Sequence, residues 1–416
     1  MKMEKSWVLA FLLLQVLPTE GDFGVGAGIG VGIGNGDGGG GGGGASVWIG
    51  GGINGQNPPG YTASSLSSAY TALQAWKSAI TDDPLKVLSS WVGSNVCAYR
   101  GVFCADPEED GSGQTGPVVA GIDLNRANLQ GTLVKELSVL TDMSLLHLSG
   151  NRFTGTVPES FRYLLSLKEL DLSNNHFSGP FPTVTLLIPN LIYLDIRFNS
   201  FAGPVPDDLF NKELDAIIIN NNQFDGELPP NLGNSPASVI NLANNKFSGN
   251  IPTSFAYMNP KLKEILFLNN QLTGCIPEGV GMWDGMEVLD LSHNSLMGHL
   301  PNSISCLEEI EVLNLAHNKL SGSLSDLVCS LRSIVNLTVA YNFFSGFGQE
   351  CSKLFFRNVG FDFSVNCIPG RDMQRPQPDC SVIPGGGLNC LRIPSARPLI
   401  CGLVGSPETD PSPSSP

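Results

Sequence analysis

The chain has 416 residues, enough for two or three ordinary domains or one elongated repeat array, and 42% of its residues are hydrophobic. Its formal net charge of -15 argues against nucleic-acid binding, because contacts to phosphates need clusters of basic residues. The same charge favours a neutral or cationic partner.

The N-terminal residues 1–21 have the pattern of a secretory signal peptide. Lys2 and Lys5 precede an apolar stretch, from Trp7 to Leu17, that is too short to cross a bilayer. We therefore expect export into an oxidising environment, with disulfide bonds among the ten cysteines. The glycine-rich residues that follow contain no phosphate-binding motif, so residues 22–63 are interpreted as a flexible linker.

Residues 64–117 are predicted to form an N-terminal cap. Apolar residues recur near helical spacing from Leu66 to Ile80, which favours a helix followed by a turn. Cys97 and Cys104 come next, and we expect them to form a disulfide within this cap.

Residues 118–346 repeat a pattern with a period of about 24 residues. The unit LDLSHNSLMGHLP, from Leu289 to Pro301, shows it most clearly. Asparagine holds one place of the pattern at residues 151, 175, 199, 222, 245, 270, 294, 318 and 342, and Ala127 takes that place in an atypical first unit.

Each part of the pattern has a physical reason. Two apolar residues before the asparagine have strand spacing and point inward, and the asparagine can satisfy backbone groups of adjacent turns. No unit can bury its own apolar face, so the units must stack. The pattern therefore predicts an α/β fold, a right-handed solenoid of ten leucine-rich repeats, with parallel strands near residues 146–148, 170–172, 194–196 and onward to 337–339.

The C-terminal part of the chain lacks a recognisable repeat. Residues 347–405 carry five of the cysteines, and they are interpreted as a cysteine-rich cap, as a docking element, or as both. Residues 406–416 are rich in proline and serine and are expected to be disordered.

The remaining cysteines leave two pairings open. Cys306 and Cys329 lie 12 and 11 residues after the asparagines of adjacent units, which favours a Cys306–Cys329 disulfide. The alternative is Cys275–Cys306, which leaves Cys329 to pair with Cys351.

The pattern L-x-L-x-x-N-x-L-x-G-x-[IL]-P resembles the plant extracellular class of leucine-rich repeats. The stretches NNNQFDGELPPNLGNSPASVINLANNKFSG and NCIPGRDMQRPQPDC are similar, more specifically, to leucine-rich repeat extensins of plant cell walls. The resemblance implies a secreted wall protein that binds small, basic, cysteine-rich signalling peptides of the rapid alkalinisation factor type. A receptor-kinase ectodomain and a wall polysaccharide are further candidate partners. Because the sequence stops at Pro416 without a Ser-Pro-Pro-Pro-Pro block, we expect a relative lacking the extensin tail.

The variable residues that flank the inward leucines are expected on the concave face of such a solenoid. Eight of them are acidic, namely Glu169, Asp171, Asp195, Asp215, Glu264, Glu287, Asp290 and Glu311, and three are basic, namely Lys168, Arg197 and Lys263. Apolar members would add exposed area that an ordinary solvated face does not need. The predicted peptide-binding residues are Asp171, Tyr193, Asp195, Phe198, Ile218, Leu266, Asp290, His293, His317 and Tyr341.

Other chemistry is weaker in the sequence. His293 and His317 share a column about 5 Å apart by strand spacing, but no third metal ligand stands beside them. The pair Asp171 and Asp195 lies in an open ladder, so we expect neither an enzyme nor a cofactor. Asn336 belongs to an exposed N-x-[ST] sequon and is a candidate glycosylation site.

Two competing functions remain open. Polygalacturonase inhibitors share this repeat and this length, and a structural wall protein is a third hypothesis. The long cysteine-rich segment favours peptide binding over the inhibitors, which end soon after their last repeat.

Overall fold

The computed structural model describes residues 64–106, 116–258, 260–283, 285–385 and 390. The chain divides into the units Met1–Gln56 and Asn57–Pro416, and all described residues belong to the second. The predicted signal peptide (1–21), glycine-rich linker (22–63) and Pro/Ser tail (406–416) lie outside the described residues.

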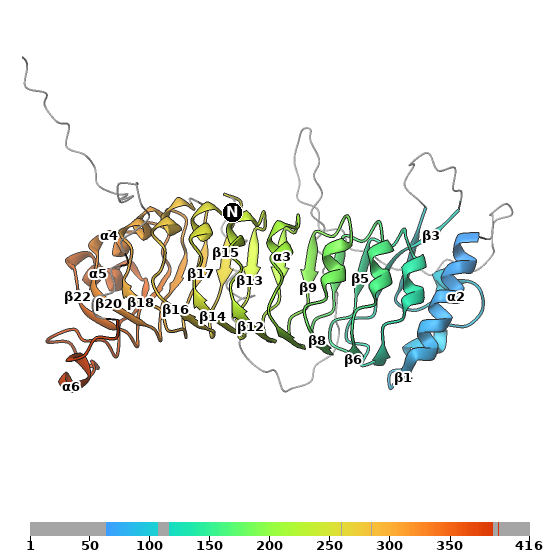
Figure 1. Ribbon diagram of the computed structural model, residues 1–416, viewed down its shortest axis with the longest axis horizontal. Coiled ribbons are helices and arrows are strands. Elements are labelled where there is room, and N and C mark those ends of the chain that lie inside the picture. Colours follow the sequence, from blue (N-terminus) through green and yellow to red (C-terminus); the bar gives the residue numbers. More distant parts are fainter. Residues whose placement is uncertain (1–63, 107–115, 259, 284, 386–389, 391–416) are drawn as a thin grey trace, which may run out of the picture. The chain divides into compact units, whose positions relative to one another are not determined.

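A sheet of twelve strands carries one strand from every repeat (Figure 1). Pairing is parallel from β3 onward, and only β2 joins β3 in the antiparallel sense. In sheet order the strands are β2 (Val102–Ala105), β3 (Val118–Asp123), β5 (Leu145–His147), β7 (Glu169–Asp171), β9 (Tyr193–Asp195), β11 (Ala216–Ile218), β13 (Val239–Asn241), β15 (Glu264–Leu266), β17 (Val288–Asp290), β19 (Val312–Asn314), β21 (Asn336–Thr338) and β23 (Gly360–Asp362). The parallel strands confirm the predicted solenoid, each beginning one residue earlier than expected.

A second row of short strands follows the first along the stack. An eight-stranded sheet contains β1 (Ile80–Asp82), β4 (Gln130–Thr132), β6 (Arg152–Gly155), β8 (His176–Gly179), β10 (Ser200–Gly203), β12 (Gln223–Glu227), β14 (Lys246–Asn250) and β16 (Gln271–Thr273). A three-stranded sheet continues with β18 (Met297–His299), β20 (Lys319–Leu324) and β22 (Phe343–Phe347). These pairs are parallel except for the pair of β1 with β4, in which β1 belongs to the cap.

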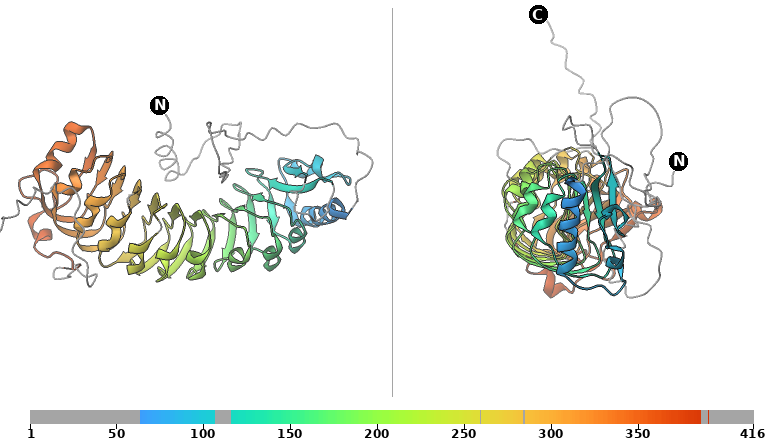
Figure 2. Two further views of the ribbon diagram at one scale, coloured as in Figure 1. Left: turned by 90° about the horizontal axis from the view of Figure 1, so that it is seen from above. Right: turned by 90° about the vertical axis from the view of Figure 1, so that its right-hand side faces the viewer.

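Helical segments complete each repeat. The α-helices are α2 (Ser64–Ala79), α3 (Asp208–Asn211), α4 (Asp326–Cys329), α5 (Gln349–Lys353) and α6 (Gln377–Cys380). The 3-10 helices are η1 (Val87–Ser90), η2 (Val96–Ala98), η3 (Lys135–Val139), η4 (Glu159–Tyr163), η5 (Thr183–Leu187), η6 (Leu232–Asn234), η7 (Thr253–Tyr257), η8 (Glu278–Met282), η9 (Asn302–Cys306) and η10 (Leu354–Arg357). Figure 2 shows this layer and the strands from above and from one end.

The repeated asparagines hold neighbouring repeats together. Asn318 donates from Nδ2 to the carbonyl oxygens of Leu291 (2.9 Å) and Leu315 (3.2 Å), and its Oδ1 accepts from the backbone N–H of Leu296 (3.0 Å). Because these backbone groups are buried, the amide removes the cost of leaving them unpaired. Each such asparagine therefore joins its own repeat to the preceding one, as the sequence pattern predicted.

The array extends beyond the predicted end at residue 346. Strand β23 pairs in parallel with β21, and Asn366 lies 24 residues after Asn342. Its Oδ1 accepts from the N–H of Phe344 at 2.9 Å, and its Nδ2 donates to Val339 O at 3.0 Å. The unit escaped the sequence pattern because Phe361 and Phe363 replace its leucines.

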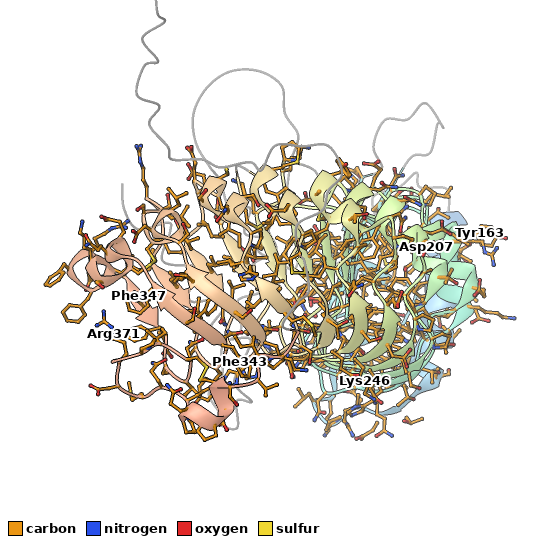
Figure 3. All side chains as sticks on the ribbon, turned by 60° about the vertical axis from the view of Figure 1, so that its left-hand side comes forward. Tyr163, Asp207, Lys246, Phe343, Phe347 and Arg371 are labelled. Atoms are coloured by element: carbon orange, nitrogen blue, oxygen red, sulfur yellow. A yellow bond between two sulfur atoms is a disulfide. The ribbon has the colours of Figure 1, made fainter. Side chains whose placement is uncertain are left out.

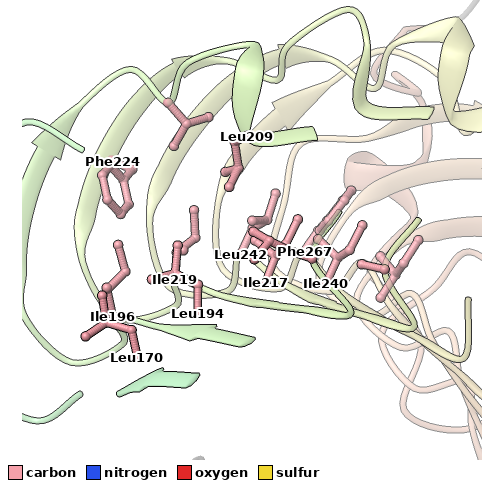
Figure 4. Packing of buried hydrophobic residues seen from close by; sticks show 14 of the residues in the cluster. Leu170, Leu194, Ile196, Leu209, Ile217, Ile219, Phe224, Ile240, Leu242 and Phe267 are labelled. Carbon is pink, nitrogen blue, oxygen red and sulfur yellow. The ribbon is translucent and has the colours of Figure 1, made fainter. Parts of the chain in front are cut away.

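The core is continuous along the stack (Figure 4). Five phenylalanines from successive repeats form a nearly parallel row with ring centroids 6.2–6.4 Å apart: Phe153, Phe177, Phe201, Phe224 and Phe247. Trp76 of α2 extends this row, with its ring 5.9 Å from Phe153. The cap therefore covers the apolar end of the first repeats.

The disulfides correct part of the sequence analysis. Cys97 pairs with Cys104, as predicted, but Cys329 pairs with Cys351, so the Cys306–Cys329 bridge is wrong. The alternative Cys275–Cys306 is also wrong, because Cys275 pairs with Cys390. Cys329 is the last residue of α4, and Cys351 lies within α5. Their Cα atoms are 4.8 Å apart. Cys306 is itself disulfide-bonded.

Candidate functional site

The outer face of the twelve-stranded sheet is the side that points away from the core. Along it, residues of successive strands form columns, and one column runs Asp123, His147, Asp171, Asp195 and Ile218. This face contains two polar regions of different character. We call His147, Glu169, Asp171, Tyr193, Asp195 and Arg197 the acidic region, and His293, His317 and Tyr341 the ring ladder.

Asp195 is the most enclosed member of the acidic region. Its side chain is 0% exposed, Tyr193 Oη donates to its Oδ2 at 3.3 Å, and the Arg197 N–H donates to its Oδ1 at 3.0 Å. Arg197 Nε lies 3.2 Å from Oδ2, at an angle that makes an ion pair but no hydrogen bond. Burial raises the pKa of Asp195 to about 7. Asp195 was predicted to face a ligand, and this is wrong, because Tyr193 and Arg197 enclose it.

His147 and Glu169 form a second contact in the acidic region. The Nε2 atom of His147 lies 3.0 Å from Oε2 of Glu169. Burial alone lowers the pKa of His147, but the contact with Glu169 and the charge of Asp171 outweigh it, so the net pKa is raised. The carboxylates beside His147 therefore stabilise its protonated form.

The ring ladder is a stack of three aromatic side chains on adjacent repeats. The rings of His293 and His317 lie 4.0 Å apart at 14°, and those of His317 and Tyr341 lie 4.0 Å apart at 12°. The predicted adjacency of the two histidines is confirmed. Tyr341 is 42% exposed, and His293 is exposed as well. Because the rings cover one another's faces, their polar edges are what a ligand can contact.

The backbone beneath the ladder is unusual for such residues. His293, His317 and Tyr341 have φ of 53°, 54° and 55°, in the left-handed region. The same column holds Asn221, Asn244 and Asn269, whose side chains form an amide ladder through bonds of 2.9 and 2.8 Å. Asparagine and histidine are enriched in this conformation, whereas a bulky residue such as Tyr341 is uncommon there. The backbone therefore accommodates the two histidines and disfavours Tyr341.

The other predicted residues are distributed along the same face. Phe198 and Ile218 are half-buried between the two regions, whereas Leu266 is only 6% exposed, so its prediction as an exposed contact is wrong. In the register of the sheet, Leu266 lies between Asn241 and Asp290. Asp290 accepts hydrogen bonds from Ser292 N and Asn314 Nδ2, and burial raises its pKa. Asn336 is exposed at the start of β21.

Two arginines beside the ring ladder escaped the sequence analysis. The guanidinium of Arg375 lies 4.3 Å above the ring of Phe343. That of Arg371 lies 5.0 Å above the ring of Phe347 (Figure 3). They belong to the stretch NCIPGRDMQRPQPDC, which the sequence analysis used only for the resemblance. Burial and the charges of His293 and Arg375 lower the pKa of His317, which places Arg375 next to the ladder.

Among the described residues, no group of three His, Cys, Asp or Glu side chains could hold a metal ion. Within the same residues, no helix has the length and apolar character to cross a membrane. Eight of the ten predicted contact residues are at least partly exposed and remain candidates for ligand contact: Asp171, Tyr193, Phe198, Ile218, Asp290, His293, His317 and Tyr341.

Family models and curated proteins agree with this repeat architecture. Residues 66–105 match the leucine rich repeat N-terminal domain, and residues 141–201, 238–258, 285–307 and 309–331 match leucine rich repeat models. Leucine-rich repeat extensin-like protein 7 of Arabidopsis thaliana is 64% identical over 228 residues, covering 55% of this chain and 52% of that protein. Leucine-rich repeat extensin-like protein 6 of the same plant is 52% identical over 236 residues, covering 56% and 50%. The chain thus spans about half the length of these relatives.

Solved structures show the same fold. A plant peptide hormone receptor, RGFR1 in complex with RGF2, has a TM-score of 0.57 at 25% identity, covering 60% of this chain and 40% of the receptor. A TDR receptor has a TM-score of 0.57 at 28% identity, covering 60% and 43%. A plant ice-binding protein, at 24% identity and a TM-score of 0.59 over 75% of this chain and 96% of that one, shares the fold alone.

Proposed function

Because the chain is a leucine-rich-repeat protein of the extensin-like family, we propose that it is a secreted binding protein of the plant cell wall and not an enzyme. Its ligand on the outer face is a basic, cysteine-rich signalling peptide of the rapid alkalinisation factor type. The observation that carries the proposal is the presence of the ring ladder and the acidic region on the same face of the twelve-stranded sheet. The three stacked rings lie on the sheet face that points away from the core, and two of them are exposed, which supports a role in ligand contact.

The charges of the outer face support a cationic ligand. Two of the three basic residues predicted on this face form ion pairs within the protein. Arg197 pairs with Asp195 and Lys263 pairs with Glu287, each at 3.2 Å. Asp171 is half-buried and has no basic side chain within ion-pair distance among the described residues. The surplus charge therefore attracts a basic peptide and speeds its encounter with the protein.

Surface plasmon resonance tests the proposal. A synthetic rapid alkalinisation factor peptide is immobilised, and association is measured at two salt concentrations. The substitution Asp171→Lys should slow association roughly two- to fivefold and weaken its salt dependence, because it removes long-range attraction. Asp208→Lys on α3 is the matched control, since it makes the same charge change in the helical layer.

Two outcomes would overturn the proposal. Absence of binding by any basic secreted peptide would remove its central claim. Slowing of a fungal polygalacturonase by the purified protein, without peptide binding, would establish the inhibitor function in its place.

A further inference from the structure

The cysteine loop, residues 367–380, is fixed against the last repeat. The Cys367–Cys380 disulfide closes it, and two backbone hydrogen bonds of 2.7 Å attach it, from Val365 N to Met373 O and from Arg375 N to Asn366 O. Asn366 is itself a member of the asparagine row. The loop therefore has a defined position beside the ring ladder.

The two arginines of this loop are oriented but lack acidic partners. Arg375 Nε donates to Asn342 O at 2.8 Å, and the ring of Phe343 supports the guanidinium at 4.3 Å. Arg371 rests 5.0 Å above Phe347. Neither guanidinium forms an ion pair with a carboxylate among the described residues. In a chain with 38 acidic and 23 basic residues, such a pair is available to an external anion.

A cavity of about 390 Å³ lies between these side chains. Arg371 and Arg375 line it together with Gln374, Gln377 and Gly370, so two guanidinium groups border the same space. Asp372 also lines the cavity, and it is exposed and forms no ion pair with either arginine. Guanidinium groups bind carboxylates through two parallel hydrogen bonds, which neutral solutes cannot reproduce.

We propose that this cavity, which the arginines hold beside the ring ladder, receives a carboxylate of the bound peptide, either its C-terminus or an acidic side chain. This inference rests on the proposed function. Asp171 and Tyr341 lie seven strands apart on the outer face, or roughly 34 Å at a strand spacing near 4.8 Å. A peptide whose basic residues lie over the acidic region would then place its carboxylate in the cavity beside the ring ladder. The negative charge of the acidic region and the positive charge of the arginines would together set the orientation of the peptide along the sheet.

The cavity is tested first with a small carboxylate. Thermal unfolding of the whole chain is followed with succinate or with neutral succinamide at constant ionic strength. Succinate alone should raise the melting temperature, by roughly 1–3 °C at tenfold excess over its Kd. Arg371→Gln and Arg375→Gln should abolish the rise, and Arg375→Lys should retain part of it.

Arg162→Gln is the matched control, because Arg162 lies 5.9 Å over the Tyr163 ring but is paired with Glu159. This variant should keep the full succinate effect. No effect of succinate on the unmodified chain, or an equal effect of succinamide, overturns the site.

The second test uses a synthetic rapid alkalinisation factor peptide with a free or an amidated C-terminus. The free acid should bind about tenfold more tightly, as for one hydrogen bond to a charged group, and Arg375→Gln should remove the difference. If both forms bind equally but succinate competes with them, an acidic side chain is the source.

The remaining outcomes separate this inference from the proposed function. Peptide binding that neither amidation nor succinate affects overturns the carboxylate site and leaves peptide binding intact. Absence of any peptide binding overturns both. Arginine-dependent binding of an oligogalacturonate in place of the peptide assigns the cavity to an acidic sugar and overturns the inference.

Discussion

The acidic region and the ring ladder lie on the same sheet face, but their side chains differ in accessibility. In the acidic region, Tyr193 and Arg197 enclose Asp195, so its carboxyl group is bound inside the protein and is not accessible to a ligand. In the ring ladder, His293 and Tyr341 are exposed, and their backbone is in the left-handed region. A conspicuous carboxylate can therefore belong to the fold, whereas the exposed stacked rings remain the proposed contact with a partner.

Charge reversal at Asp195 should have the largest effect on this comparison. Asp195→Lys places an ammonium against Arg197 in a fully buried site, and we expect the free energy of unfolding to fall by about 3–5 kcal/mol. Asp195→Asn keeps the shape and most hydrogen bonds, so it should cost far less. Urea unfolding of both variants measures this, and a stable Asp195→Lys protein would show that Asp195 is not enclosed.

Stability should also depend on pH through Asp195. Its pKa is raised from 3.8 to about 7, so between these values the folded state binds more protons than the unfolded chain. The free energy of unfolding therefore declines as the pH rises through this range, by at most about 4 kcal/mol. The raised pKa of His147 acts in the same direction, since its contribution is lost as the pH rises through the folded value.

Urea unfolding at pH 5 and pH 8 measures the pH effect. The wild-type chain should be more stable at pH 5, and Asp195→Asn should remove most of the difference. The lowered pKa of His317 acts in the opposite direction and should remain in the variant. An undiminished pH dependence in Asp195→Asn would assign the effect to other groups.

The smallest effect on stability is expected at the ring ladder. Tyr341→Asn relieves backbone strain but loses the stacking with His317, so the unfolding free energy should change by less than about 1 kcal/mol. Peptide release should nevertheless be faster, because the loss of Tyr341 as an anchor should weaken the binding free energy by about 1–3 kcal/mol. Surface plasmon resonance measures release. Phe198→Asn in the same column should have less effect, and equal effects would remove the special role of the stack.

The sequence was sufficient for the ten repeats with regular apolar positions, but not for the last unit, in which Phe361 and Phe363 replace the leucines. A period of 24 residues predicted the parallel strands, the role of the asparagines and the neighbouring positions of His293 and His317. It could not predict the burial of Asp195, because that depends on how Tyr193 and Arg197 fold over it within one repeat. Strand alternation says only that a residue points away from the core.

The cysteines show the same limit. Cys329 lies 23 residues after Cys306 and 22 before Cys351, so either neighbour is about one repeat away. Spacing alone cannot choose between two adjacent turns at nearly equal distance. The arginines of the cysteine loop were missed because nothing in their spacing shows that they stack on Phe343 and Phe347.

The Cys275–Cys390 disulfide changes how the chain would carry a mechanical load. It joins two residues that are 115 positions apart, and β17, β19, β21 and β23 lie between them. A pulling force applied beyond Cys390 passes through the sulfur atoms to Cys275 and enters the backbone there. The strands in between are bypassed, so the ring ladder and the cysteine loop would keep their structure under tension, while the repeats before Cys275 would be stretched first.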